Sequence, residues 1–306
     1  MDDRLRLLAR VRAGRAAGTS DDTLMRRLRL RRDAYRALVD ELAGGADVPD
    51  DPAARLPWCD CDNTGTNPAG LLEEARWAAA LRPPARWQID QVHTTPADLA
   101  RRASFLLEHG DIQGKDVLFV GDDDFCSLLV AKVGRPRRVV VVDIDERILE
   151  TLGAQARAHG LPLETYPYDL SRLATEDAPA ALAGAFDTFV TDPPYSDSGM
   201  MLFCAFGMSI LRRRPGAVAC VATPWLVREE WSDELLYRLQ TAFVGEGFLL
   251  SDVKRAFSAY EHEDGVFATF LRCVSFLPDR EPKRLLGAYE PKKLYSARRW
   301  DVEEKS

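Results

Sequence analysis

Apolar residues recur at spacings of three and four along the first part of the chain. This periodicity predicts amphipathic helices over residues 2–17 and 20–43. Residues 46–70 are rich in Pro, Gly, Asp and Asn, which favours a loop or linker. A further helical pattern at residues 71–82 stops at a pair of prolines. We therefore expect an N-terminal helical domain with its linker over residues 1–86.

After residue 86 the pattern changes to short apolar runs that alternate with helical stretches. Unbroken apolar runs are typical of parallel strands buried on both faces, and the alternation with helices predicts βαβ units in a doubly wound sheet. Only a polar loop, residues 254–265, joins the last two runs, so we expect an antiparallel pair at the sheet edge. The seven predicted strands are residues 116–121, 138–143, 163–168, 186–191, 217–222, 248–253 and 266–276.

Seven strands that end in such a hairpin resemble the Rossmann-like fold of S-adenosylmethionine-dependent transferases. The fold class is therefore α/β, with a catalytic domain over residues 87–278 and a C-terminal extension over residues 279–306. The loop between the last two strands contains an acidic and aromatic segment, residues 258–264. This segment either closes over a ligand or forms a solvated hairpin tip.

Acidic residues follow four successive predicted strands, at the end where open α/β sheets bind their ligands. A single aspartate there is a common helix cap. Acids at four strand ends that face one crevice instead predict a binding site, and their clustering is expected to raise the pKa of at least one. These residues are Asp122, Asp123, Asp124, Asp143, Asp169 and Asp192.

The loop after the first strand has one glycine followed by three carboxylates, whereas a dinucleotide-binding turn has the pattern G-x-G-x-x-G. Carboxylates repel phosphate, so the loop disfavours NAD, FAD and ATP. A phosphate-free adenosyl sulfonium cation fits, either S-adenosylmethionine or its decarboxylated form. By position, Asp143 is expected to bind the ribose hydroxyls and Asp169 to lie near the adenine amino group. The predicted cofactor-binding residues are Gly121, Asp122, Asp123, Asp143, Ile144, Asp169 and Leu170.

The segment D-P-P-Y, residues 192–195, follows the fourth strand and predicts an acceptor site. Its carboxylate can orient an amine nucleophile, and its tyrosine ring can cover a flat or cationic group. His93 precedes the helix that leads into the first strand and is either a substrate contact or a hydrogen-bonded structural residue. The predicted substrate-binding residues are Asp192, Pro193, Tyr195 and His93. The catalytic candidates, one of which would take a proton from the nucleophile, are Asp122, Asp124 and Asp192.

Five segments together resemble the branched-chain polyamine synthases, also called bis(aminopropyl)spermidine synthases. They are VGDDDFCSLLVA (120–131), VVDIDERIL (141–149), YDLSRL (168–173), FDTFVTDPPYS (186–196) and DQVHTTPADLARRA (90–103). The resemblance implies transfer of a 3-aminopropyl group from decarboxylated S-adenosylmethionine to an internal amine of a linear polyamine. It also implies that residues 122–124 line the site for the cationic donor and the amine, and that Asp192 holds the attacking nitrogen.

Three alternatives stay open at this point. Residues 279–300 are basic where that family has an acidic tail, which leaves room for an intact S-adenosylmethionine donor. Such a donor would deliver a 3-amino-3-carboxypropyl group to a specialised metabolite by the same in-line displacement. The D-P-P-Y segment also occurs in amino-directed methyltransferases. The third alternative is a nucleic-acid-binding regulator that uses the basic N-terminal helices.

Composition and charge narrow these possibilities. The 306 residues are 46% hydrophobic and 29% charged, which is typical of a soluble globular protein, and we find neither a membrane span nor a secretory signal. The net charge of −7 divides into +4 for residues 1–45 and −11 for the remainder. Acids interleave the N-terminal arginines, so nucleic acid is an unlikely partner.

We predict a cytoplasmic homo-oligomer with a small-molecule acceptor. We predict no metal site, because Cys59 and Cys61 lack a second ligand pair.

Overall fold

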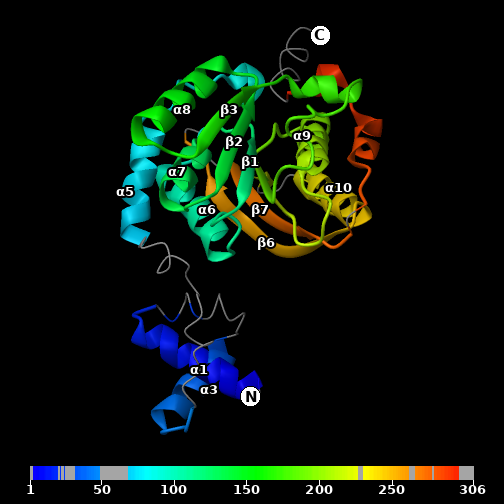
Figure 1. Cartoon of the computed structure of the whole chain (residues 1–306). Coiled ribbons are helices and arrows are strands. Elements are labelled where there is room, and N and C mark those ends of the chain that lie inside the picture. The colour runs from blue at the N-terminus through cyan, green and yellow to red at the C-terminus, as the bar shows by residue number, and fades with distance from the viewer. Residues whose placement is uncertain are drawn as a thin grey trace. The chain divides into compact units, whose positions relative to one another are not determined.

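The computed structural model describes residues 3–19, 21, 24, 32–48, 68–226, 230–261, 266–277 and 279–295. The chain forms two compact units, residues 1–63 and 64–306, which are described separately (Figure 1). Helix α5 (Pro68–Ala79) packs against α6 (Pro96–Glu108) and so belongs to the second unit, although the sequence placed it in the N-terminal part. No helix among the described residues is both long and apolar enough to cross a bilayer.

In the first unit, α1 (Asp3–Ala16) packs against α3 (Arg32–Ala43). Their shared core contains Leu8, Val11, Leu24, Tyr35 and Leu38, all buried. These residues include the apolar positions whose spacing predicted the helices. Residues 25–31, with several of the arginines considered for nucleic acid, lie outside the described part of the chain, as do Cys59 and Cys61.

The second unit is built on one seven-stranded sheet of order β3-β2-β1-β4-β5-β7-β6 (Figure 1). The first five strands are parallel, and β7 is antiparallel to both β5 and β6. This confirms the predicted fold class and the antiparallel edge pair. The strands are β1 (Asp116–Val120), β2 (Arg138–Asp143), β3 (Leu163–Pro167), β4 (Thr188–Thr191), β5 (Val218–Leu226), β6 (Phe248–Ala259) and β7 (Val266–Ser275).

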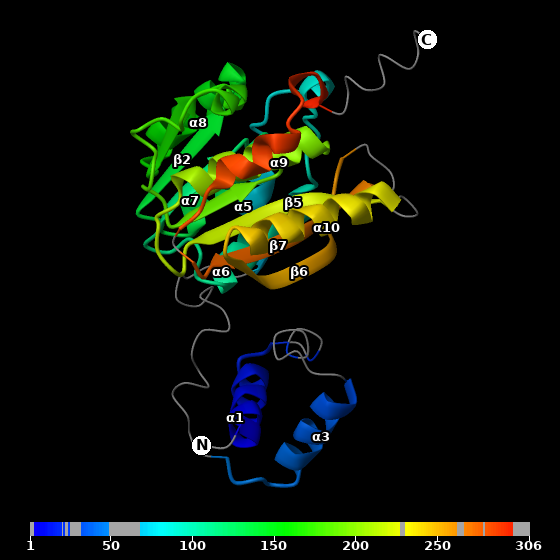
Figure 2. The ribbon, with the colours of Figure 1, turned by 90° about the vertical axis from the view of Figure 1, so that its right-hand side faces the viewer.

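Helices cover both faces of the sheet, because alternate strand residues point to opposite sides and both sets are apolar. Helices α5, α6, α7 (Cys126–Val133) and α8 (Glu146–His159) share one core with one sheet face. Helices α9 (Asp197–Ile210) and α10 (Glu230–Gly245) share the other core. Figures 1 and 2 show the two helical layers on either side of the strands. Four 3-10 helices complete the described part of the unit: η2 (Trp87–Ile89), η3 (Leu170–Ala174), η4 (Pro282–Ala288) and η5 (Pro291–Lys293).

The segment 279–295 lies along α9 (Figure 2). The Ser196 hydroxyl donates to the Leu294 carbonyl oxygen at 2.8 Å and also accepts from the Gly199 N–H, which caps α9. A Cβ atom at Gly199 would lie 2.7 Å from that carbonyl oxygen. Glycine therefore permits the close approach between the start of α9 and the C-terminal segment.

Strand β6 is longer than the sequence predicted. The polar loop expected over residues 254–265 was wrong in its first half, because β6 continues to Ala259 and its last residues pair with β7. Phe257 stacks on Phe270 and packs edge-on against Phe105. These contacts of a partly buried ring with α6 and β7 favour the extended strand despite the polar residues beside it.

We expect Gly207→Ala to lower the free energy of unfolding by about 1–3 kcal/mol. Gly207 lies in α9 against the ring of Phe189, and a Cβ atom there would be 2.5–2.7 Å from three ring carbons. Gly153→Ala in α8 is the matched control, since its nearest contacts would be 3.4 and 3.6 Å. Urea unfolding of both variants tests this, and the control is expected to gain about 0.5–1 kcal/mol from helix propensity. A neutral or stabilised Gly207→Ala would contradict the prediction.

Acid pH is expected to weaken an ion-pair cluster at the amino end of β1. Arg137 Nε donates to Asp116 at 2.8 Å, and this bonding, together with Arg212, lowers the pKa of Asp116 to about 2. A depressed carboxyl pKa stabilises the fold above the unfolded value near 4, and this contribution is lost as the pH falls through 2. Asp116→Asn should therefore cost about 2 kcal/mol at pH 5 and little at pH 2. Urea unfolding at the two pH values measures the difference; equal losses would argue against this assignment.

Candidate active site at the carboxyl ends of β1 and β4

A pocket opens where the chain leaves β1 and β4. It brings together the acidic residues that the sequence placed at these two strand ends. Its lining residues are Arg102, Phe119, Gly121, Asp122, Asp123, Asp124, Cys126, Val190, Thr191, Asp192 and Phe270. Four carboxylates and one guanidinium therefore face a shared space, so the pocket favours a cationic ligand.

Gly121 starts the acidic loop with a positive φ of 69°, a conformation that side chains with a Cβ atom rarely adopt. Its N–H donates to the Val142 carbonyl oxygen at 2.8 Å, which ties the turn to β2. A Cβ atom at this position would lie 3.2 Å from the Phe203 ring. Glycine thus allows the chain to turn sharply and present three consecutive aspartates.

Asp122 caps helix α7. Its Oδ1 accepts the Cys126 N–H and its Oδ2 accepts the Ser127 N–H, both at 3.0 Å. Burial raises the pKa of Asp122 to about 8, although these hydrogen bonds oppose the shift. Both carboxylate oxygens of Asp122 are therefore occupied, and its role is to hold the start of α7 beside the pocket.

Asp124 is also held at both oxygens. Its Oδ1 accepts the Thr94 N–H at 2.6 Å, and its Oδ2 accepts from Arg102 Nη1 at 2.8 Å. Arg82 also links Asp124 to Thr94. Its Nε donates to the Asp124 carbonyl oxygen at 2.9 Å, and its Nη1 donates to the Thr94 carbonyl oxygen at 2.8 Å. Asp124 therefore joins the acidic loop to the segment before α6 and to α6 itself.

Asp123 differs from its two neighbours. The half-buried carboxylate has no hydrogen bond or ion pair with any residue that the structure describes. Burial raises the pKa of Asp123 well above the usual range, and the nearby carboxylates, chiefly Asp124 and Asp192, add to this effect. Both oxygens of Asp123 are thus available to a ligand, and the surrounding charge makes a cation the favoured one.

Asp192 is held by one oxygen only. Its Oδ2 lies 2.8 Å from Arg102 Nη1 and accepts the Tyr260 hydroxyl proton at 2.8 Å. The structure assigns no partner to Oδ1 among the described residues. Burial raises the pKa of Asp192, while the Arg102 charge opposes the rise. Asp192 therefore combines a fixed carboxylate with one oxygen open to an acceptor.

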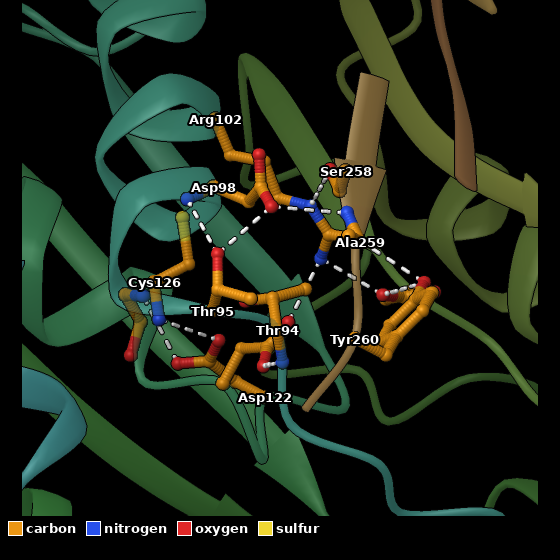
Figure 3. Close-up of polar contacts among 12 residues, drawn as sticks. Thr94, Thr95, Asp98, Arg102, Asp122, Cys126, Ser258, Ala259 and Tyr260 are labelled. Atoms are coloured by element: carbon orange, nitrogen blue, oxygen red, sulfur yellow. Dashed lines mark hydrogen bonds and ion pairs between the residues drawn. The ribbon is translucent and has the colours of Figure 1, made fainter. Parts of the chain in front are cut away.

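Sequence reasoning missed two central residues, Arg102 and Tyr260. The buried Arg102 guanidinium also donates from Nε to Ser258 Oγ at 2.8 Å and from Nη2 to the Tyr260 hydroxyl at 3.2 Å (Figure 3). Arg102 lies one helical turn after Asp98 in α6, but an arginine on a helix is normally a surface residue and gave no signal. Tyr260 belongs to the acidic and aromatic segment 258–264, whose possible closure over a ligand was the only hint.

The predicted donor residues at β2 and β3 lie outside the pocket lining. Asp143 accepts the Asp145 N–H at 2.8 Å and the Asp122 N–H at 3.2 Å, which ties the ends of β1 and β2 together, and burial raises its pKa. Ile144 beside it is 50% exposed, which leaves an apolar surface next to the carboxylate. Asp169 is exposed and caps η3 through the Ser171 N–H, while Leu170 is buried. Their roles in donor binding stay predictions.

The acceptor residues have mixed surroundings. Tyr195 is half-buried and its hydroxyl is hydrogen-bonded to that of Tyr260, while Pro193 is buried. His93 is half-buried, and burial together with the Arg82 charge lowers its pKa, so the ring is neutral near pH 7. Its backbone carbonyl oxygen accepts the Glu261 N–H at 2.7 Å. Within the described ranges, no group of three or more His, Cys, Asp or Glu residues is arranged to bind a metal ion.

Comparison with known proteins agrees with the resemblance. A family model described as the branched-chain polyamine synthase A C-terminal domain matches residues 70–298. The N(4)-bis(aminopropyl)spermidine synthase of Thermus thermophilus is 35% identical over 186 residues, covering 61% of this chain and 52% of the relative. The protein of the same name from Thermococcus kodakarensis is 31% identical over 192 residues, covering 62% and 52%. The chain spans about half the length of the curated relatives it matches.

A solved structure extends the likeness. The branched-chain polyamine synthase from Thermus thermophilus, in complex with N4-aminopropylspermidine and 5′-methylthioadenosine, aligns with a TM-score of 0.65 and 27% identity. The alignment covers 96% of this chain and 92% of that chain. The family model covers most of the sequence, including both acidic segments of the pocket. This chain belongs to the branched-chain polyamine synthase family.

Proposed function

We propose that this chain transfers a 3-aminopropyl group from decarboxylated S-adenosylmethionine to an amine of a polyamine. The proposal rests on one observation, the difference in hydrogen bonding among the four aspartates of the pocket. Asp122 and Asp124 are occupied by protein donors, whereas Asp123 and one oxygen of Asp192 are unpartnered among the described residues. The free oxygens can accept hydrogen bonds from an ammonium group. A bound ammonium or sulfonium cation would favour the ionised form of these two carboxyls, whose pKa burial raises.

The reaction is an in-line displacement. The lone pair of the acceptor nitrogen forms a bond to the carbon beside the donor sulfur, and the carbon–sulfur electron pair returns to sulfur. The leaving group is 5′-methylthioadenosine, a neutral thioether. The nitrogen loses one proton, which Asp192 Oδ1 accepts, while Asp123 binds the positive charge of the bound amines. Catalysis on this scheme consists of orientation and one proton transfer.

The surroundings of the arginines favour the decarboxylated donor. Arg102 contacts two aspartates, a serine and a tyrosine, and Arg82 donates to two backbone carbonyl oxygens. An intact donor would bring its carboxylate into a pocket of four aspartates, where Arg102, the one guanidinium of the described lining, already binds two of them. Arg82, whose Nη2 has no hydrogen-bond partner among the described residues, is not one of the lining residues. The name of the relatives and the complex with N4-aminopropylspermidine and 5′-methylthioadenosine support the same donor and a polyamine acceptor.

The test is incubation of the full chain with spermidine and each donor separately, followed by mass spectrometry of both products. We expect 5′-methylthioadenosine and a polyamine heavier by one aminopropyl group, only with the decarboxylated donor. A product that carries an aminocarboxypropyl group from the intact donor would overturn the donor assignment. Formation of S-adenosylhomocysteine and a methylated amine would identify a methyltransferase and refute the proposal.

A further inference from the structure

The end of β6 is fastened to the segment that precedes α6. The Thr95 N–H donates to the Ala259 carbonyl oxygen at 3.3 Å, and the Glu261 N–H donates to the His93 carbonyl oxygen at 2.7 Å. Asp98 Oδ2 accepts the Ala259 N–H at 3.1 Å (Figure 3). These bonds lie on either side of Tyr260 along the chain and fix its backbone beside α6.

The direction of every hydrogen bond at the Tyr260 hydroxyl follows from its single proton. That proton is donated to Asp192 Oδ2. Arg102 has only donors, so its Nη2 donates to the Tyr260 oxygen. The remaining lone pair of that oxygen accepts the hydroxyl proton of Tyr195. The network therefore has one orientation, and it ends on a single oxygen of Asp192.

We propose that Tyr260 is a positioning residue that, together with Arg102, holds Asp192 Oδ2 so that Oδ1 meets the acceptor amine. The inference rests on the proposed function, because Asp192 is taken as the proton acceptor. The three side chains come from the position directly after β6, from α6 and from the loop after β4. The β6–β7 hairpin therefore contributes directly to the geometry of the reacting carboxylate. A free carboxylate would rotate about its Cβ–Cγ bond, and fixing it keeps the proton transfer aligned.

The charged and titratable groups around Asp192 set the expected pH response. They are Arg102 from α6, Asp123 and Asp124 from the loop after β1, Tyr195 from the loop of Asp192 itself, and Tyr260 directly after β6. The Tyr260 hydrogen bond stabilises the ionised carboxylate, so its removal raises the pKa of Asp192. The ionised base is then lost at a higher pH, and the acidic limb of the kcat profile moves upward.

The experiment compares Tyr260→Phe with the unchanged chain in the aminopropyl transfer assay, with Tyr237→Phe as control because Tyr237 is 70% exposed on α10. We expect kcat to fall about 10- to 100-fold in Tyr260→Phe, the acidic limb to move upward, and the KM for the donor to stay within about twofold. Tyr237→Phe is expected to match the unchanged chain in all three measurements.

Tyr195→Phe tests whether Tyr195 acts on Asp192 only through Tyr260. The substitution removes the Tyr195 hydroxyl, which contacts that of Tyr260, and retains the ring. We expect the same direction of change and a smaller loss of kcat than in Tyr260→Phe. The positioning role is refuted if Tyr260→Phe leaves the acidic limb in place, or if Tyr195→Phe has the larger effect. An unchanged chain without transfer activity would refute the proposed function instead, so the two failures are distinguishable.

Discussion

Replacing Asp192 by asparagine lowers kcat for aminopropyl transfer by about 10²–10⁴-fold, the range typical of losing a general base. Asparagine has almost the same shape, and its carbonyl oxygen can still accept from Arg102 and Tyr260. It cannot take the proton that the attacking nitrogen must lose. The measurement is the steady-state release of 5′-methylthioadenosine across pH, with the KM of each substrate determined alongside.

Asp123→Asn is the matched comparison, because it removes one charge from the same pocket. Asp123 is assigned to binding the cationic groups, so its loss should raise the KM for the amine substrates more than it lowers kcat. The assignment of roles fails if Asp192→Asn keeps more than about a tenth of the activity, or if the two variants show the same split between kcat and KM.

Replacing Arg102 by methionine is expected to cost about 3–5 kcal/mol of unfolding free energy, as for other broken buried ion pairs. The side chain is 4% exposed and contacts Asp124 and Asp192, each at 2.8 Å. Methionine fills much of the space but leaves two carboxylates in a poorly solvated pocket without their counter-charge. Urea unfolding of the variant and of the unchanged chain, compared by fluorescence and circular dichroism, measures the loss.

The pH dependence of that loss identifies its cause. Burial already raises the pKa of Asp192, and without Arg102 this pKa rises further. A carboxyl whose folded pKa is raised destabilises the fold progressively as the pH increases from the unfolded value to the folded one. The variant should therefore lose less stability at pH 5 than at pH 8. Arg101→Met is the control, since this neighbouring side chain is 54% exposed, and it should cost less than about 1 kcal/mol. If Arg102→Met loses the same unfolding free energy at pH 5 as at pH 8, the loss comes from packing and not from the unpaired carboxylates.

Local patterns in the sequence were sufficient for the sheet and for the placing of the acids. The buried run DVLFV of β1 identified a parallel strand, and its position next to β4 brought Asp122–Asp124 to Asp192. Local patterns could not predict which of these carboxylates lacks a hydrogen-bond donor from the protein. That depends on the first turn of α7, whose N–H groups occupy Asp122, and on Thr94, which lies 30 residues before Asp124.

The residues that escaped sequence reasoning act over long separations. Arg102 and Tyr260 are 158 residues apart, and Tyr260 and Asp192 are 68 apart. Their meeting requires β6 to continue beyond its apolar stretch, where it pairs with β7, and residues 259–261 to bond to the segment before α6. No local periodicity records this pairing. A polar, acidic hairpin has the same composition whether its tip is solvated or its base lines an active site.

The hydrogen bond between Ser196 and Leu294 can form only after nearly the whole chain has been translated. These residues are 98 positions apart, and the helix that the contact completes starts immediately after the D-P-P-Y segment. During translation the sheet strands up to β7 emerge first, and the start of α9 receives its last hydrogen bond only after residue 294 has been made. A chain cut short between β7 and residue 294 would therefore retain every strand of the sheet yet lack the bond that secures the segment beside Asp192.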